Sequence, residues 1–160
     1  MGYSCADPTQ PPVRCAPGYI APFTKKTSCD ACPAGFYCPD PTQYPTMCQV
    51  HPTYSYYSTP GLASCSLCPA GYKCDNPATA PVACPAGWYS ELGWPMCKPC
   101  PAGYYCPILS QILVDGSNLW SDVGAPLNCP IGTYSLPAST SCTACPAGSY
   151  CPYSTNGYYS

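Results

Sequence analysis

Apolar side chains occur along this chain in short, interrupted groups rather than at helical or strand-length periods. A typical group is one or two aromatic residues directly after a Pro-Ala-Gly turn, as at Phe36-Tyr37 and Tyr104-Tyr105, and polar loops separate successive groups. Prolines recur every few residues, so no run remains for a long helix or the centre of a sheet. The pattern predicts two- or three-residue β-bridges, mostly irregular backbone and almost no helix.

The turns belong to a ten-residue frame, Cys-x-x-Cys-Pro-Ala-Gly-x-x-Cys, which occurs four times. The copies begin at Cys29, Cys65, Cys97 and Cys142. An internal repeat of this kind indicates a tandem array. Within the frame, proline sets the first corner of a β-turn, and glycine accepts the positive φ that closes it.

The chain is expected to divide into four repeats, each opening with a cysteine, a turn and an aromatic residue. They cover residues 15–47, 48–83, 84–128 and 129–160. The second opening departs from the pattern, since His51 and Pro52 stand where the glycine is expected.

Residues 1–14 resemble the tail of a preceding copy, because Cys5 and Cys15 are separated by the same ten-residue step as Cys38 and Cys48. We therefore expect a window on a longer array, with the partner of Cys5 lying upstream and the last repeat continuing beyond residue 160. The alternative is a complete chain in which Cys5 is unpaired or pairs between subunits.

An apolar insert at residues 107–128 interrupts the third repeat. Its spacing fits one amphipathic helical turn, and residues 114–119 fit a small hairpin equally well. One interpretation is an insertion that packs its apolar side on the adjacent repeat. The other is a contact patch for a partner. The candidate contact residues are Ile108, Leu109, Ile112, Leu113, Leu119 and Trp120.

Composition points to disulfides in place of a hydrophobic core. The chain has 17 cysteines, 24 prolines and 13 glycines among 160 residues, which is typical of a disulfide scaffold. Repeats of this size bury too little apolar surface to fold without covalent links. Cysteine use on this scale indicates an oxidising compartment, either secreted or at the cell surface.

Charge and hydropathy exclude two classes of partner. The net charge is −2 and only 8% of residues are charged, so no basic surface for nucleic acid or an anionic membrane is expected. The longest apolar run is far shorter than the roughly 20 residues that a membrane span needs.

Four cysteines per repeat allow three pairings, and spacing favours one of them. The interval between the third and fourth cysteines is constant, while that between the first and second varies, and variation in a closed loop costs little. The alternative crosses first with third and second with fourth. The favoured pairs are Cys15–Cys29, Cys48–Cys65, Cys84–Cys97 and Cys129–Cys142, together with Cys32–Cys38, Cys68–Cys74, Cys100–Cys106 and Cys145–Cys151.

The sequence gives little support for a metal site or a catalytic site. An all-cysteine zinc site is compatible with the spacing, but the proline- and tyrosine-rich composition argues against it. Redox Cys-x-x-Cys motifs open a helix in a βαβ unit, and the sequence predicts none. The acids are scattered, and His51 is interpreted as a turn residue. We expect no catalytic residues, cofactor or metal.

The motif Cys-Pro-x-Gly-x-Tyr followed by Ser-Cys-x-x-Cys-Pro-Ala-Gly-x-Tyr-Cys resembles the cysteine-rich repeats of ephrin-receptor and tumour-necrosis-factor-receptor type. Similar arrays occur in surface proteins of protists and algae, including mastigoneme proteins. The resemblance covers nearly the whole chain outside the insert. It implies an elongated tandem repeat rod and carries no catalytic residues.

The leading hypothesis is a structural segment of an extracellular filament or fibre at the cell or flagellar surface. Its expected partners are copies of itself or other matrix proteins and glycans, because tyrosines offer flat contact area and the many Pro, Ser and Thr leave room for O-linked sugars. The alternative is a receptor or adhesin ectodomain stalk that binds a protein ligand. A secreted inhibitor or toxin-like scaffold is a third, minor hypothesis.

Overall fold

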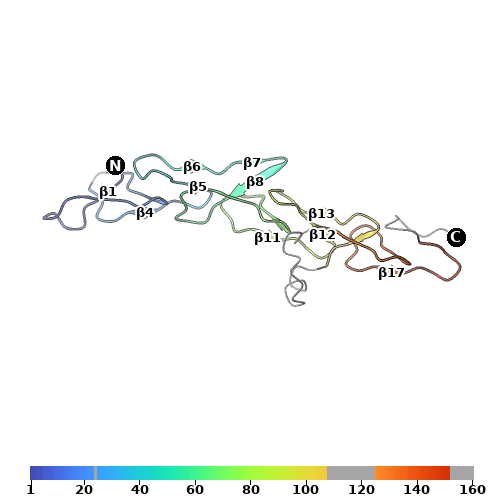
Figure 1. The fold of residues 1–160 in the computed structure, drawn as a ribbon. Coiled ribbons are helices and arrows are strands. Elements are labelled where there is room, and N and C mark those ends of the chain that lie inside the picture. Colours follow the sequence, from blue (N-terminus) through green and yellow to red (C-terminus); the bar gives the residue numbers. More distant parts are fainter. Residues whose placement is uncertain (24, 108–124, 152–160) are drawn as a thin grey trace. The chain divides into compact units, whose positions relative to one another are not determined.

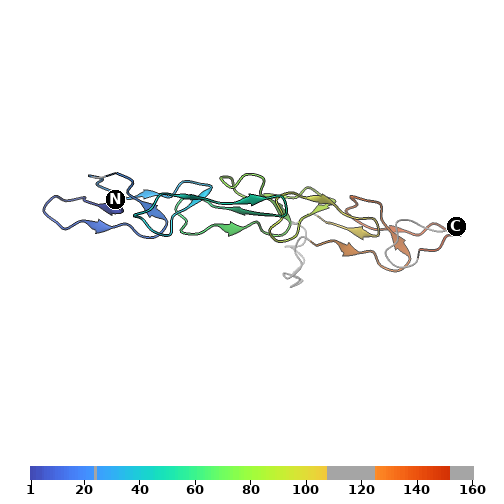
Figure 2. The same cartoon turned by 90° about the horizontal axis from the view of Figure 1, so that it is seen from above.

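The computed structural model describes residues 1–23, 25–107 and 125–151. Over these residues the chain forms seventeen short β-strands and no helix, which confirms the expected disulfide-rich fold of short β pieces. Seven sheets have two strands and one has three. Figures 1 and 2 show these strands as small pairs separated by irregular chain.

Every strand pairing is antiparallel, and the strands of a pair follow one another in the sequence. The three-stranded sheet consists of β7 (Val50–His51), β8 (Tyr54–Tyr57) and β9 (Ser66–Leu67). The two-stranded sheets are β1 (Tyr3–Ser4) with β2 (Val13–Arg14), β3 (Tyr19–Ile20) with β4 (Asp30–Ala31), β5 (Phe36–Tyr37) with β6 (Thr46–Met47), β10 (Tyr72–Lys73) with β11 (Val82–Ala83), β12 (Trp88–Tyr89) with β13 (Lys98–Pro99), β14 (Tyr104–Tyr105) with β15 (Leu127–Asn128), and β16 (Thr133–Tyr134) with β17 (Thr143–Ala144).

Turn and cysteine together set the register of each hairpin. In the two-stranded hairpins, the first strand follows a turn glycine, and in all of them the second strand ends directly before a cysteine. The N–H of Cys32 donates to the carbonyl of Gly18 at 2.8 Å, and the N–H of Cys48 donates to that of Gly35 at 2.8 Å. The same bond recurs in the other hairpins, so the cysteine spacing decides where each hairpin closes.

In the second repeat, the expectation that His51 and Pro52 occupy the glycine position is wrong. Ser55 occupies it, because its carbonyl accepts the N–H of Cys68 at 2.9 Å. The preceding residues form an extra hairpin of β7 and β8, in which His51 pairs with Tyr54. The error arose because the proline and aromatic residue of this hairpin imitate a repeat opening.

Cysteines occupy the interior in place of a conventional core. Apart from glycine and proline, the buried described residues are eleven cysteines, Ile20, Ala21 and the four serines Ser55, Ser58, Ser90 and Ser135. Large apolar side chains such as Tyr44 and Phe23 are exposed. Covalent links between cysteines therefore replace the packing of large apolar residues.

The chain forms two compact units. The first comprises residues 1–68 and 74–81 and holds β1 to β9, and the second comprises residues 69–73 and 82–160 and holds β10 to β17. The division passes through the loop between Cys68 and Cys74. The repeat boundaries expected from the sequence stay a prediction.

A left-handed residue lies four positions before the second cysteine of each repeat. The φ angles are 65° at Lys25, 85° at Gly61, 86° at Gly93 and 61° at Ala138. Side chains with a Cβ rarely adopt this conformation, which costs about 1 kcal/mol or more. The N–H bond of Ala138 to the Cys100 carbonyl and the close contact of its own carbonyl with Gly87 hold Ala138 in it.

The left-handed turn lies directly against the turn glycine of the preceding repeat in both units. A Cβ at Gly18 would overlap the carbonyl oxygen of Gly61, and a Cβ at Gly87 would overlap that of Ala138. Both glycines also have positive φ. Glycine is therefore required at Gly18 and Gly87 for two independent reasons.

Gly18→Ala is expected to lower the free energy of unfolding by about 2 kcal/mol or more, because it adds a steric overlap to the backbone strain. Gly61→Ala is the control, since Gly61 has nearly the same positive φ but its Cβ would lie 3.8 Å from the nearest atom, the Tyr19 hydroxyl oxygen. Denaturant unfolding of the oxidised chain measures the free energy of unfolding of both variants. Equal losses would show that backbone strain alone acts at Gly18.

Candidate functional site

Sixteen of the seventeen cysteines form eight disulfides, and these are the pairs that the spacing favoured. The pairs at a separation of six residues are Cys32–Cys38, Cys68–Cys74, Cys100–Cys106 and Cys145–Cys151. The longer pairs are Cys15–Cys29, Cys48–Cys65, Cys84–Cys97 and Cys129–Cys142. No crossed pair is present among these residues, so these sulfurs are bonded to one another rather than available as thiolates.

Backbone hydrogen bonds beside the short disulfide link it both to its own repeat and to the next one. We call this set of contacts the repeat junction. In the first unit, Gly18 N–H donates to the Cys38 carbonyl at 2.8 Å, Cys38 N–H donates to Leu62 at 3.1 Å, and Gly61 N–H donates to Cys32 at 2.9 Å. Both cysteines of one disulfide thus hold the neighbouring repeat through their own main chain.

The second unit repeats the same three bonds. Gly87 N–H donates to the Cys106 carbonyl at 3.1 Å, and Cys106 N–H donates to Ser139 at 3.0 Å. Ala138 N–H donates to the Cys100 carbonyl at 2.8 Å. The repeat junction is therefore a recurring structural element and not a feature of one repeat.

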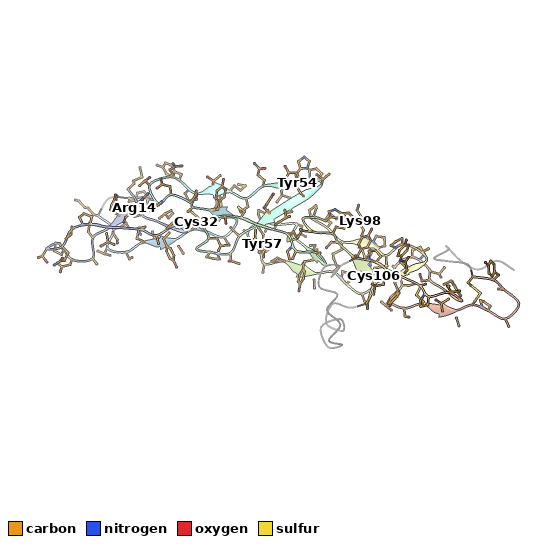
Figure 3. All side chains as sticks on the ribbon, viewed as in Figure 1. Arg14, Cys32, Tyr54, Tyr57, Lys98 and Cys106 are labelled. Carbon is orange, nitrogen blue, oxygen red and sulfur yellow. A yellow bond between two sulfur atoms is a disulfide. The ribbon has the colours of Figure 1, made fainter. Side chains whose placement is uncertain are left out.

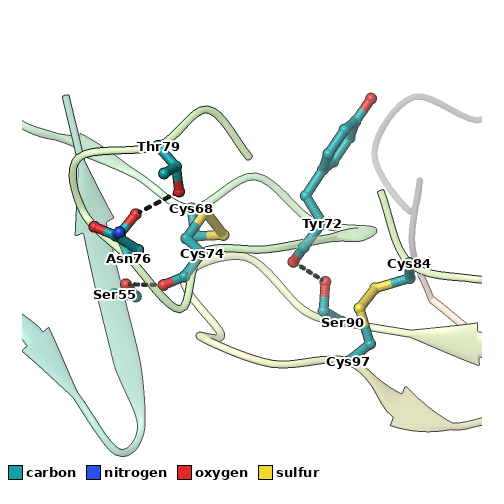
Figure 4. Close-up of a disulfide and its surroundings, with 9 residues drawn as sticks. All are labelled: Ser55, Cys68, Tyr72, Cys74, Asn76, Thr79, Cys84, Ser90 and Cys97. Atoms are coloured by element: carbon teal, nitrogen blue, oxygen red, sulfur yellow. Dashed lines mark hydrogen bonds between the residues drawn. A yellow bond between two sulfur atoms is a disulfide. The ribbon is translucent and has the colours of Figure 1, made fainter. Parts of the chain in front are cut away.

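A buried serine adds a reciprocal pair of bonds at the junction. Ser90 accepts the N–H of Gly71 on its carbonyl at 2.8 Å and donates its hydroxyl to the carbonyl of Tyr72 at 2.6 Å (Figure 4). Ser58 forms the same two bonds with Gly35 and Phe36, and Ser135 forms them with Gly103 and Tyr104. Sequence reasoning missed these serines, although each lies three residues after the turn glycine or its replacement.

Ser55 shows how the junction tolerates loss of the turn glycine. At the other junctions, the glycine N–H donates to a cysteine carbonyl, as Gly18 does to Cys38. Ser55 is buried and donates its hydroxyl to the Cys74 carbonyl at 2.6 Å (Figure 4). A side-chain donor therefore replaces the main-chain donor.

Aspartate-centred turns form the loops that follow Cys5 and Cys38. Asp40 accepts the backbone N–H of Thr42 at 2.9 Å and its hydroxyl at 2.8 Å. Arg14, which is labelled in Figure 3, forms a 3.1 Å ion pair with the Asp40 carboxylate. The two hydrogen bonds from Thr42 and, more weakly, the Arg14 charge lower the pKa of Asp40. The hydroxyl and N–H of Thr9 lower the pKa of Asp7 in the same way.

Two groups of aromatic side chains lie on or beside the strands. His51 stacks on Tyr54 with ring centroids 4.7 Å apart, and Tyr56 meets Tyr54 edge-on at 5.9 Å. In the second unit, the ammonium of Lys98 lies 3.9 Å from the centroid of the Trp94 ring. His51 Nδ1 also lies 2.8 Å from the Thr53 hydroxyl, so this imidazole is part of the hairpin turn.

Cys5 is the one described cysteine outside the eight disulfides. Cys5 is exposed and unpaired, and its N–H donates to the carbonyl of Lys26 at 2.8 Å. The predicted contact patch, from Ile108 to Trp120, lies outside the described residues.

The described residues form neither a cluster of metal ligands nor a helix that could span a membrane. In that part of the chain, no three His, Cys, Asp or Glu side chains gather as ligands for a metal ion. Within the same residues, no helix has the length and apolar character needed to cross a membrane.

Ser90→Ala is expected to lower the free energy of unfolding by about 1 kcal/mol, because the Tyr72 carbonyl loses a buried hydroxyl donor. The first repeat offers the reverse change, since the buried Ala21 occupies the corresponding position and accepts the N–H of Gly2. Ala21→Ser is expected to stabilise the chain by a similar amount. Thermal unfolding measures the stability of both variants. A Ser90→Ala variant that is more stable than the unchanged chain would contradict this role of the serine.

The Asp40 carboxylate is expected to contribute stability above its unfolded-state pKa and to lose it as the pH falls through the lower folded-state pKa. Thr42→Ala should raise the pKa of Asp40 toward the ordinary aspartate value, and Arg14→Gln should raise it less. Carboxyl-carbon NMR titration measures both, with Asp7 as the internal reference. A larger rise in Arg14→Gln would show that the ion pair dominates.

Compared with known proteins, the chain matches no protein-family model. No curated protein matches it either. The ephrin-receptor-like and tumour-necrosis-factor-receptor-like resemblance therefore stays an expectation from its motif.

Proposed function

We propose that this chain is a structural segment of an extracellular filament or fibre, at the cell surface or the flagellar surface. The eight disulfides support an extracellular or secreted location, because such bonds persist in oxidising compartments. The proposed role is structural rather than enzymatic. In support, sixteen cysteines are oxidised and Asp7, Asp40 and His51 take part in turns.

The repeat junction carries the proposal. The same three backbone bonds recur in both units, and each set lies beside a six-residue disulfide. In tandem-repeat proteins, stability is approximately the sum of the repeats and their nearest-neighbour contacts. A recurring junction of this kind supports a role that depends on the length and stiffness of the chain. It gives less support to a role that depends on a single binding pocket.

The proposed partners are copies of the chain, other matrix proteins and glycans. Aromatic side chains are partly exposed at the start of several hairpins, with relative exposures of 43% at Tyr19 and 40% at Trp88. Such rings offer contact area at low conformational cost. Few charges are present to recruit nucleic acid.

Electron microscopy of the oxidised chain and of the native material is expected to show ordered polymers. Removing one short disulfide by the double change Cys32→Ser and Cys38→Ser should shorten or abolish them, because the bond contributes about 2 kcal/mol in the chain-entropy model. Cys5→Ser is the matched control, since Cys5 is unpaired and all eight disulfides remain.

Dispersed monomers at every concentration, together with tight binding of a soluble protein ligand, would contradict a structural role. That outcome would favour the receptor or adhesin ectodomain instead.

A further inference from the structure

Two tyrosines of the three-stranded sheet lie ring against ring on one strand. Tyr54 and Tyr56 belong to β8 and are two positions apart, so their side chains project from the same face of the sheet. Their ring centroids are 5.9 Å apart, and the rings meet at an interplanar angle of 79°. This is an edge-on aromatic contact, in which atoms of the two rings touch. The sheet therefore places two phenols directly beside each other.

The strand that carries the two rings is anchored from its opposite face. Ser55 lies between them in the sequence, is buried, and donates its hydroxyl to the Cys74 carbonyl at 2.6 Å. β8 is also the central strand of its sheet, with β7 on one side and β9 on the other. His51 stacks on Tyr54 with ring centroids 4.7 Å apart. Backbone pairing and ring stacking therefore keep Tyr54 and Tyr56 in contact.

Solvent reaches this pair of phenols. Tyr54 has a relative exposure of 39%, and Tyr56 is half-buried. A one-electron oxidant removes an electron and the hydroxyl proton from a tyrosine, and the resulting radical carries spin on the two ring carbons ortho to the oxygen. Two such radicals couple when their ortho carbons meet, and holding the two rings in contact favours that meeting.

We propose that Tyr54 and Tyr56 form an oxidative cross-linking site, where an extracellular haem peroxidase using hydrogen peroxide joins them as dityrosine. Each tyrosine loses one electron and one proton, and the two radicals form a carbon–carbon bond between ring carbons ortho to the hydroxyls. The hydrogen on each coupled carbon then moves to its phenol oxygen. Hydrogen peroxide takes up the two electrons and two protons and becomes two molecules of water.

This cross-link strengthens the loop in which the disulfides leave the longest stretch of chain unbraced. β7 and β8 lie inside the loop closed by Cys48–Cys65, whose separation of 17 residues is the largest among the eight disulfides. No other cysteine lies between these two in the sequence. A carbon–carbon bond is also not cleaved by thiols, so it persists under conditions that reduce disulfides. The bond forms within one chain and does not require the self-association proposed above.

The test is oxidation of the dispersed, disulfide-bonded chain by a haem peroxidase and hydrogen peroxide. The expected product is a monomer with the blue fluorescence of dityrosine. Mass spectrometry of the reduced peptides should locate a loss of two hydrogen atoms between residues 54 and 56. Tyr54→Phe and Tyr56→Phe should each abolish this product, because phenylalanine keeps the ring but has no hydroxyl to oxidise.

Tyr57→Phe is the matched control for the adjacent tyrosine. Tyr57 is half-buried, as Tyr56 is, but it projects from the opposite face of the sheet. Tyr44→Phe is the control for exposure alone, since Tyr44 is 75% exposed. Both controls should give the same yield of intramolecular dityrosine as the unchanged chain.

Persistence of the intramolecular product in Tyr54→Phe or Tyr56→Phe, or its loss in Tyr57→Phe or Tyr44→Phe, would overturn the proposal. Dityrosine that forms only between copies, or does not form while free tyrosine in the same solution couples, would also overturn it. Because the product is measured on monomers, failure of this test leaves the proposed filament role to be judged by electron microscopy alone.

Discussion

The disulfide between the third and fourth cysteines of each repeat is the constraint on which the rest of the structure depends. Its two cysteines lie at the repeat junction, where Cys32 accepts the N–H of Gly61 and Cys38 both accepts and donates a main-chain bond. A six-residue loop keeps these groups at a fixed spacing. The covalent bond thus orients the hydrogen bonds that join consecutive repeats.

This arrangement removes the need for a large apolar core and leaves the loops free to vary. The first-to-second disulfides span 14, 17, 13 and 13 residues without changing the hairpin bonds. Ser55 replaces a glycine because its hydroxyl supplies the missing donor. At this position, the junction therefore requires a hydrogen-bond donor to the cysteine carbonyl, and residues other than glycine can supply it.

The absence of a large apolar core also affects the surface of the described residues. Aromatic rings that would fill a core elsewhere are partly exposed here, and Tyr44 is 75% exposed. Their contact area supports the proposed association with chains of the same kind. The proposed structural role rests on the recurrence of one contact, whereas a receptor role would depend on a loop that differs from the rest.

Cysteine spacing and the Pro-Ala-Gly turn are local features, and from them the sequence alone predicted short β pieces with almost no helix and favoured one of three disulfide pairings. Tertiary structure decided the features whose partners lie in another repeat. Ser90 gains its role only because the Tyr72 carbonyl is brought beside it. Ala138 adopts a left-handed conformation that its side chain disfavours, because its contacts with Cys100 and Gly87 of the preceding repeat outweigh local preference.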